Sequence, residues 1–377
     1  MQPHIGYVFW ECLLVERTLR MFIYLFVGLL FGGLAIAHPY VTLKNGNKYA
    51  KPYFYCILIF TIFLIVAFRK CGFDYDNYLY WFNSLQSDYW KNNAVTMGIE
   101  IGYAWINNVV GSYRTLLIII AALTMGIYST FIYKKSPYPF LSLYLLLGTF
   151  LYPTLMGQYR QGAAIAFFLL ALLYRKNQIL FCTIIVCGSF LHVSILLTLV
   201  TLFVPDKLLT KKQYLAIIII ALLCNVGSYD IFLSMIDSMP DFVAAKLNVY
   251  QKTEQGTILR FNLAMLLRII IFLIFYKERY CISQYKDGIF YLNLYFVSLF
   301  IYLGFGFLPQ LGGRGSIYFY FMELILSAMI MSRERRSSFF YLIFFLSVGM
   351  YRQISFFSIW HEDYIPYKSE LLSVFGL

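Results

Sequence analysis

The sequence predicts an all-α polytopic membrane protein, and two observations support this prediction. Of the 377 residues, 61% are hydrophobic and only 13% are charged, and the mean hydropathy is +0.70. A soluble domain could not bury that much apolar surface, so lipid must be the solvent for most of it. Apolar runs that approach the length of a membrane helix also recur along the whole chain, separated by short basic segments.

A transmembrane helix needs about 20 mostly apolar residues. The runs that come near this length are residues 21–38, 53–68, 114–133, 138–156, 161–174, 178–204, 213–230, 258–276, 288–307, 315–332 and 338–357. We expect these runs to give about 11–12 membrane segments. With no soluble segment of domain size between them, residues 1–377 are expected to form a single integral-membrane domain.

The orientation of the spans follows from lysine and arginine, which favour short cytoplasmic loops. The groups expected there are Lys134–Lys135, Arg175–Lys176, Lys207 with Lys211–Lys212, Lys277 with Arg279, and Arg333 with Arg335–Arg336. Counted as one helix, residues 178–204 would place the later groups outside. Two short arms that turn near residues 189–194 return them to the cytoplasm, so a broken or re-entrant pair is favoured.

Four further segments lie at the termini or on the outer side in this arrangement. They are a lead-in at residues 1–20, outer loops at 69–113 and 231–257, and an outer tail from residue 358 to 377. The net charge of +12 fits the basic cytoplasmic loops and does not indicate nucleic acid. The sequence has no CxxC pair among its seven cysteines and no HExxH motif, so neither a disulfide framework nor a metal site is expected.

Two arginines stand on the outer side, against the usual charge bias. Arg160 follows Tyr159 and precedes Gln161 at the start of one span, and Arg314 lies in the sequence LGGRGS at the start of another. Either side chain could simply reach the outer headgroups. A pair of planar guanidinium groups, each near a helix N-terminus, also suits the binding of one phosphate-bearing ligand.

The expected turn near residues 189–194 contains His192. A histidine in an apolar stretch is often a packing residue, but ionisable groups at membrane depth are also candidates for function. An imidazole there could act as a base or as a phosphate partner.

The outer loop 69–113 is rich in acids and aromatic rings. Its acids between residues 71 and 110 are Asp74, Asp76, Asp88 and Glu100, and its tyrosines and tryptophans are Tyr75, Tyr78, Tyr80, Trp81, Tyr89, Trp90, Tyr103 and Trp105. Such a segment could lie in the membrane interface. Rings beside carboxylates also suit a sugar site, for which Asp74 and Glu100 are favoured because they stand closest to the neighbouring spans.

Several short motifs occur in a fixed order along the chain. The first three are D-x-x-x-Y from Asp74 to Tyr78, E-x-G-Y from Glu100 to Tyr103, and R-Q-x-x-A from Arg160 to Ala164. The later ones are F-L-H-x-S from Phe190 to Ser194, G-R-x-x-x-Y with its arginine at Arg314 and its tyrosine at Tyr318, and the pair Pro366-Tyr367. In this order the sequence resembles the EpsG-like branch of the Wzy family of O-antigen and exopolysaccharide polymerases. The resemblance covers most of the chain, apart from the first twenty residues.

The resemblance implies a GT-C-like membrane glycosyltransferase in the bacterial inner membrane, with its active site facing the periplasm. The outer loops and tail would then be periplasmic. Such an enzyme joins oligosaccharide units carried on undecaprenyl diphosphate, which serves as donor and acceptor; it uses no cofactor and can work beside a chain-length regulator.

Site roles follow from this implied reaction. We expect Arg160 and Arg314 to stabilise the departing diphosphate, with support from Arg114 and Tyr318. The acceptor base is expected to be His192, Glu100 or Asp74, in that order. The further residues expected to contact substrate are Gln161, Tyr159, Tyr78, Tyr103 and Tyr364.

Other functions share parts of this pattern. An O-antigen ligase would use the same donor and a different acceptor. A membrane acyltransferase also uses an intramembrane histidine, although its donor would come from the cytoplasm. A flippase for lipid-linked sugars is an alternative of another class, but transporters often show internal repeats and charges at the midplane, and this sequence shows no repeat.

Overall fold

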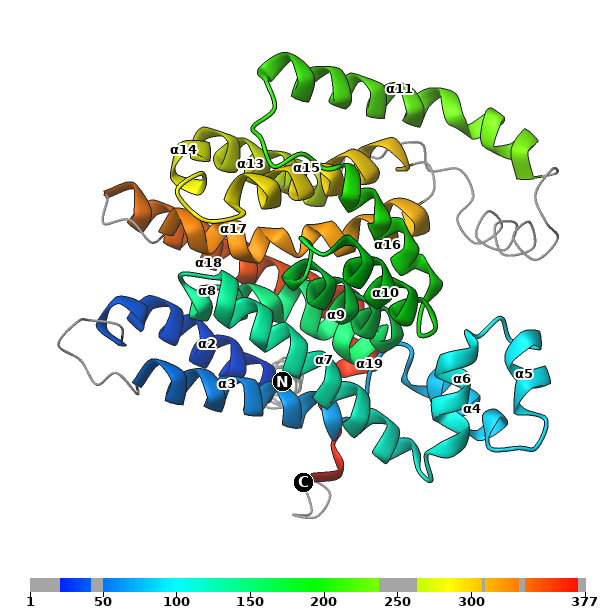
Figure 1. Ribbon diagram of the computed structural model, residues 1–377. Helices are drawn as coiled ribbons and strands as arrows, with labels where there is room; N and C mark the ends of the chain where they lie inside the picture. Colours follow the sequence, from blue (N-terminus) through cyan, green and yellow to red (C-terminus); the bar gives the residue numbers. More distant parts are fainter. Residues whose placement is uncertain (1–20, 42–49, 237–262, 307–308, 332–335, 372–377) are drawn as a thin grey trace, which may run out of the picture. The chain divides into compact units, whose positions relative to one another are not determined.

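Figure 1 shows a computed structural model of the protein, which describes residues 21–41, 50–236, 263–306, 309–331 and 336–371. Over these ranges the chain forms helices joined by turns, with one isolated β-bridge between Arg69 and Ser369. The described residues include six helices long and apolar enough to cross a membrane: Phe22–Pro39, Ala50–Ala67, Tyr113–Lys135, Pro139–Gly157, Gly312–Met331 and Ser338–Ile359. The predicted all-α, multi-pass membrane class is therefore confirmed.

The helices follow the predicted apolar runs. Single helices are α2 (Phe22–Val41), α3 (Ala50–Ala67), α7 (Tyr113–Lys135), α9 (Tyr159–Leu173), α11 (Lys211–Ile236), α13 (Leu263–Lys277), α15 (Gly288–Gly304) and α18 (Arg336–Ile359). Two runs consist of consecutive helical pieces: α8 (Pro139–Leu146) with the π-helical segment η1 (Leu147–Gly157), and α16 (Pro309–Tyr320) with α17 (Met322–Met331). Pro153 lies inside η1, and a proline has no N–H for the α-helical ladder, which favours a locally widened turn.

The apolar run 178–204 is broken, as its charge pattern predicts. The first arm is α10 (Gln178–Ser189), and the second is η2 (Val193–Phe203), a 3-10 helix. Between them the backbone N–H groups of Leu191 and His192 both donate to the carbonyl of Gly188 and close a turn. The break lies at His192, whereas the direction in which each arm crosses the membrane stays a prediction.

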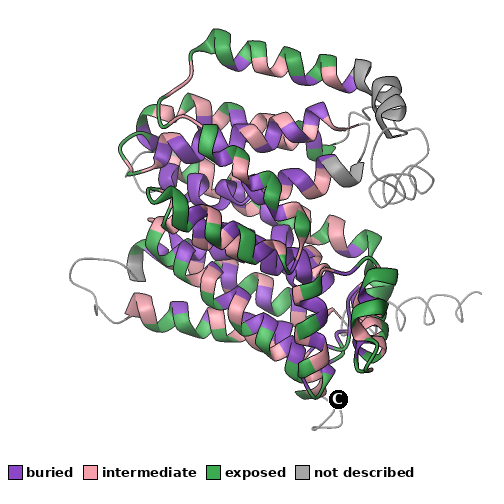
Figure 2. Cartoon of the chain, turned by 45° about the vertical axis from the view of Figure 1, so that its right-hand side comes forward, coloured by how far each residue is buried: buried purple, intermediate pink, exposed green. Residues whose placement is uncertain are grey.

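The chain divides into two compact units, residues 1–193 with 331–377, and residues 194–330. Within the first unit α2 packs on α8, α3 packs on α7, and α9 packs on α7 and α10. The spans differ in how far the protein covers them (Figure 2). In the Pro139–Gly157 span 94% of the residues are buried, whereas in the spans of α2 and α18 only 28% are buried. Apolar residues such as Leu29, which is 76% exposed, face outward from these helices. Exposure of so many apolar side chains is favourable in lipid and costly in water.

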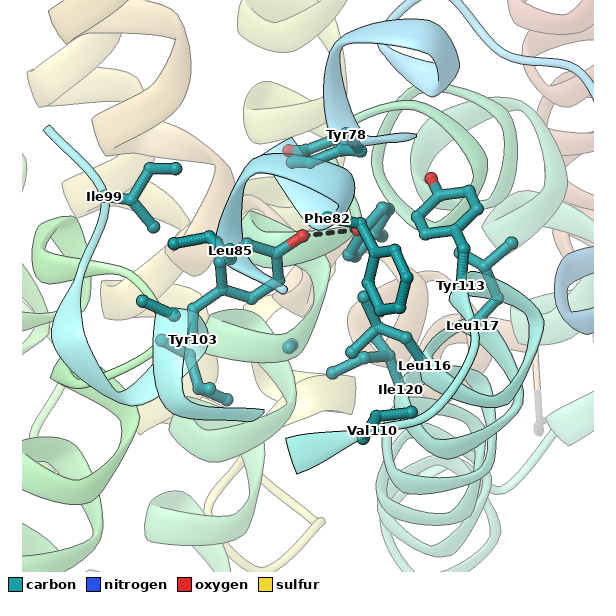
Figure 3. Packing of buried hydrophobic residues seen from close by; sticks show 14 of the residues in the cluster. Tyr78, Phe82, Leu85, Ile99, Tyr103, Val110, Tyr113, Leu116, Leu117 and Ile120 are labelled. Atoms are coloured by element: carbon teal, nitrogen blue, oxygen red, sulfur yellow. Dashed lines mark hydrogen bonds between the residues drawn. The ribbon is translucent and has the colours of Figure 1, made fainter. Parts of the chain in front are cut away.

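The outer loop 69–113 is itself helical, with α4 (Tyr75–Leu85), α5 (Trp90–Thr96) and α6 (Ile101–Val109). These short helices pack on one another, and their apolar side chains join those of α7 and α9 in one buried cluster (Figure 3). The cluster is Tyr78, Phe82, Leu85, Ala94, Ile99, Tyr103, Ala104, Val110, Tyr113, Leu116, Leu117, Ile120, Tyr159, Ala163 and Leu191. The aromatic richness of this loop therefore builds a hydrophobic core beside the membrane helices.

The C-terminal tail folds back onto the first unit through the short helix α19 (His361–Tyr364) and the residues after it. The backbone N–H of Gly72 donates to Asp363, the N–H of Lys70 donates to Lys368, and the N–H of Glu370 donates to the carbonyl of Phe68. These bonds hold the tail against residues 68–72, where the segment 69–113 begins.

The second unit is built around α15. Helices α11, α13 and α16 all pack on α15. On α11, Tyr214 donates a hydrogen bond to Asn293 (2.7 Å), and the amide of Asn225 donates to the carbonyl of Leu303 (2.7 Å). These buried polar contacts fix α11 along α15 at two points. Most of the outer loop expected at 231–257 lies outside the described residues.

Candidate functional site

A half-buried acid lies at the start of α6. Glu100 occupies the N-cap position of that helix, but its carboxylate does not cap the helix. One oxygen, Oε1, instead lies 3.3 Å from Nδ1 of His192 and accepts a hydrogen bond from the backbone N–H of Val193 (3.2 Å). The other oxygen, Oε2, forms an ion pair with Nη2 of Arg160. The structure thus brings together three residues that the sequence singled out separately.

The backbone explains why Glu100 reaches the broken segment. The N–H of Tyr103 donates to the carbonyl of Phe190 over 3.0 Å, so the first turn of α6 docks directly on the turn before His192. Gly102 makes this approach possible, because a Cβ at this position would lie 2.6 Å from the Cβ of Phe190 and 2.8 Å from its carbonyl oxygen. The E-x-G-Y motif therefore has a structural meaning: the acid holds the turn, the glycine permits contact, and the tyrosine N–H anchors it.

Arg160 lies in the first turn of α9 and is 8% exposed. Its guanidinium carbon is 4.8 Å from the ring centroid of Tyr103 and 5.2 Å from that of Trp81. Aromatic faces attract a desolvated cation, and the carboxylate of Glu100 balances its charge. Arg160 is thus held in one place by two rings and one acid.

A tyrosine network extends from the same residues. The hydroxyls of Tyr103 and Tyr159 share a hydrogen bond, drawn as a dashed line in Figure 3, and the ring of Tyr78 lies 4.1 Å from that of Tyr159, centroid to centroid. Burial raises the pKa of Tyr103 well above its ordinary value, because the apolar surroundings disfavour the charged phenolate. Through Tyr103, this network is connected to the guanidinium of Arg160.

The other predicted site residues of the first unit are Arg114, Tyr364, Asp74 and Gln161. Arg114 forms an ion pair with Glu370 (2.7 Å) and donates to backbone carbonyls, so it clamps the tail. Tyr364 is fully buried and donates to the carbonyl of Tyr152 (2.8 Å). Asp74 is half-buried at the N-cap position of α4, and Gln161 is buried in α9. Substrate contact by Arg114, Tyr364, Asp74 and Gln161 stays a prediction.

The remaining predicted residues belong to the second unit. Arg314 is half-buried in α16. Tyr318, one turn further along the helix, is fully buried, and its hydroxyl shares a hydrogen bond with that of Ser194 (2.6 Å). That bond ties α16 to the start of η2, while the phosphate-binding role of Arg314 stays a prediction.

Sequence reasoning missed the roles of two residues in the first unit. Trp81 is one ring among many in the outer loop, and only the fold places it under Arg160. Arg69 is 1% exposed, donates from Nε to the carbonyl of Met156 (3.0 Å), and lies 5.5 Å from the ring centroid of Tyr159. A charged residue directly after an apolar run was the available sign for Arg69, but its burial was not readable.

Taken together, the fold and the site define a multi-pass, all-α membrane protein with a largely buried carboxylate–imidazole–guanidinium cluster at the starts of α6 and α9. The EpsG family model matches residues 52–369, a range that includes every predicted site residue. The chain belongs to the EpsG family, whose members are exopolysaccharide- and O-antigen-polymerase-like proteins, and it is a polysaccharide polymerase-like membrane protein in this general sense. A search of curated proteins found no match, and a search of solved structures also found none.

Proposed function

We propose that the protein is a membrane glycosyltransferase that joins oligosaccharide repeat units carried on undecaprenyl diphosphate. The reaction would take place at the periplasmic face of the bacterial inner membrane and would need no metal ion. Family membership supports a polymerase-like activity. The observation that carries the proposal is the contact between Glu100 and Nδ1 of His192, because it supplies the oriented base that such a transfer needs.

The cluster suits the removal of a proton from the acceptor. With Glu100 accepting at Nδ1, the neutral imidazole of His192 carries its proton there and its basic lone pair on Nε2. Nε2 takes the proton of an acceptor hydroxyl while that oxygen attacks the anomeric carbon of the donor sugar. The bond from this carbon to the diphosphate breaks, and the diphosphate leaves with the electron pair.

Arg160 keeps Glu100 ionised and in position during this step. An ion pair in a buried setting favours the charged carboxylate, and the rings of Tyr103 and Trp81 hold the guanidinium. Glu100 is thus a positioning residue for His192. The sequence-based expectation that Arg160 also meets the diphosphate is part of the proposal, as is the same role for Arg314.

The orientation rests on the distribution of basic residues. Arg160 begins α9, whereas Arg175 and Lys176 directly follow its other end. Because basic residues favour the cytoplasm, the end of α9 that carries the cluster is proposed to face the periplasm. A lipid-linked donor can present its head group there while its prenyl chain stays in the bilayer.

The test is reconstitution with defined substrates. Purified full-length protein in detergent is incubated with undecaprenyl diphosphate-linked repeat units, a chelator and no nucleotide, and the products are separated by size. A ladder of polymer on the lipid carrier is expected. Transfer of single units to an added lipid A core, without a ladder, would identify a ligase and refute the polymerase; no transfer by correctly folded protein would refute both.

A further inference from the structure

A second arginine of interest lies in the second unit. Arg268 belongs to α13, and its neighbours from Leu263 to Lys277 are almost all apolar. Its guanidinium carbon lies 4.1 Å from the ring centroid of Tyr302 and 3.9 Å from that of Tyr320. A charged residue within an apolar membrane helix is costly, and such residues usually serve a function.

The two rings and a serine fix the orientation of this group. Tyr302 comes from α15, Tyr320 from α16, and the guanidinium lies between them. Nη1 donates to the hydroxyl of Ser316 (3.0 Å), which itself donates to the carbonyl of Gly313 (3.1 Å). Side-chain freedom is thereby lost in the folded protein, so a ligand need not order the arginine on binding.

Among the described residues, Arg268 has spare hydrogen-bond donors. Within the described part of the chain, no carboxylate pairs with Arg268, and Nη1 is the only side-chain nitrogen with a protein acceptor. Nε and Nη2 form the side edge of the guanidinium, which matches two oxygens of a phosphate. Since Arg268 is half-buried, this edge is not sealed inside the protein.

The positions of Arg268 and its neighbours along their helices indicate the side of the membrane to which Arg268 is nearer. Arg268 lies in the first half of α13, Tyr302 lies in the last turn of α15, and Ser316 lies in the first half of the Gly312–Met331 span. Lys277 is the last residue of α13 and Arg279 lies two residues beyond it, and these basic residues mark this end of the helix as cytoplasmic. The guanidinium is therefore in the half of its helix that lies farther from the basic, cytoplasmic end, on the side of the outer lipid phosphates.

We propose that Arg268, held between Tyr302 and Tyr320, binds a lipid-borne phosphate through Nε and Nη2. The phosphate belongs either to an undecaprenyl diphosphate substrate or to a phospholipid headgroup, and both offer the same paired oxygens. The first source would deepen the proposed function, since it would add a phosphate-binding residue to those expected from sequence.

Binding without turnover tests this inference. Purified full-length protein in detergent is titrated with radiolabelled undecaprenyl diphosphate, and unlabelled phosphatidylglycerol or inorganic diphosphate is added as competitor. Arg268→Gln is expected to weaken binding about tenfold or more, because a charge-assisted bidentate contact is lost. Arg268→Lys keeps the charge and the length of the side chain, and should also weaken binding because the fork is lost.

Arg279→Gln is the matched control. Arg279 also lies over two tyrosine rings, those of Tyr276 and Tyr280, at 4.6 Å and 4.5 Å, so this variant removes the same charge from the same unit. It is expected to bind as wild type does. Equal loss in Arg268→Gln and Arg279→Gln, or wild-type binding by folded Arg268→Lys and Arg268→Gln, would overturn the proposal.

The competitors identify the source of the phosphate. Equal displacement by phosphatidylglycerol assigns the site to phospholipid headgroups, whereas resistance to phosphatidylglycerol assigns it to the lipid diphosphate. A protein that shows the Arg268-dependent binding but makes no polymer would refute the proposed function and leave this inference standing.

Discussion

Replacing Gly102 with alanine is expected to separate α6 from the turn before His192. The added Cβ would lie 2.6 Å from the Cβ of Phe190 and 2.8 Å from its carbonyl oxygen, whereas ordinary contacts begin at 3.4 Å. The two segments must therefore move apart by 0.6–0.8 Å, the difference between these values. A shift of this size would stretch the hydrogen bond from Tyr103 to Phe190, now 3.0 Å, beyond a normal length.

The size of the effect follows from opposing contributions. Overpacking costs about 1–3 kcal/mol, and the lost backbone hydrogen bond costs about 1 kcal/mol. Alanine favours a helix over glycine by about 1 kcal/mol, which partly offsets the loss. A net loss of about 1–3 kcal/mol in docking corresponds to a decrease of about 5- to 150-fold in correctly assembled cluster.

The assay is polymer formation by purified protein, with amounts matched by immunoblot. Gly111→Ala is the control, because a Cβ at that position meets no atom within 4 Å and the residue lies close by in the same unit. We expect Gly102→Ala to lose activity and Gly111→Ala to retain it. Wild-type rates for Gly102→Ala would refute the docking of α6 on the Phe190 turn as a requirement of the site.

Three other outcomes are expected. His192→Ala should lower the rate of polymer formation about a hundredfold to ten-thousandfold at unchanged protein level, with partial rescue by added imidazole. Glu100→Gln should lower kcat and leave KM unchanged. Full activity in either variant would exclude His192 as the base positioned by Glu100. Tyr364→Phe should cost about 1 kcal/mol of stability, measured by thermal unfolding, and leave polymer length unaltered; shorter polymer at equal stability would instead indicate substrate contact. The guanidinium of Arg114 lowers the pKa of Glu370, so this pair should stabilise the tail above the ordinary glutamate pKa and lose that effect as pH falls through the lowered value. Limited proteolysis should show faster tail cleavage on acidification in wild type but not in Glu370→Gln.

The break within residues 178–204 is a feature that charge and hydropathy predicted from the sequence. The basic groups around residues 178–204 could not all face the cytoplasm unless that run was interrupted, and the structure interrupts it at His192. This prediction worked because each basic group is a local feature with a strong preference for one side of the membrane. The outer loop was harder, since its acids and rings fitted both an interfacial segment and a sugar site.

Arg160 illustrates what sequence could not supply. Its position at the start of an apolar helix was readable from the sequence, and a phosphate partner was the expected reason for its charge. The structure gives the guanidinium an internal partner, Glu100, and two ring neighbours, Tyr103 and Trp81. Arg268 stands in an apolar run and was open to the same reasoning, but the rings that hold it come from two other helices.

By itself, the sequence determined the membrane class, the bounds of most membrane helices and the break near His192. It also singled out a short set of polar residues that are costly to place in or beside an apolar membrane helix. These properties depend on neighbours along the chain, where hydrophobicity and charge act directly. Only the tertiary structure decided which of those polar residues meet. Glu100 and His192 are 92 residues apart, and their contact depends on a glycine that lets two backbones approach and on the packing of α6 and α9 around it. Contacts of that kind arise from the summed packing of several helices, which no local pattern encodes.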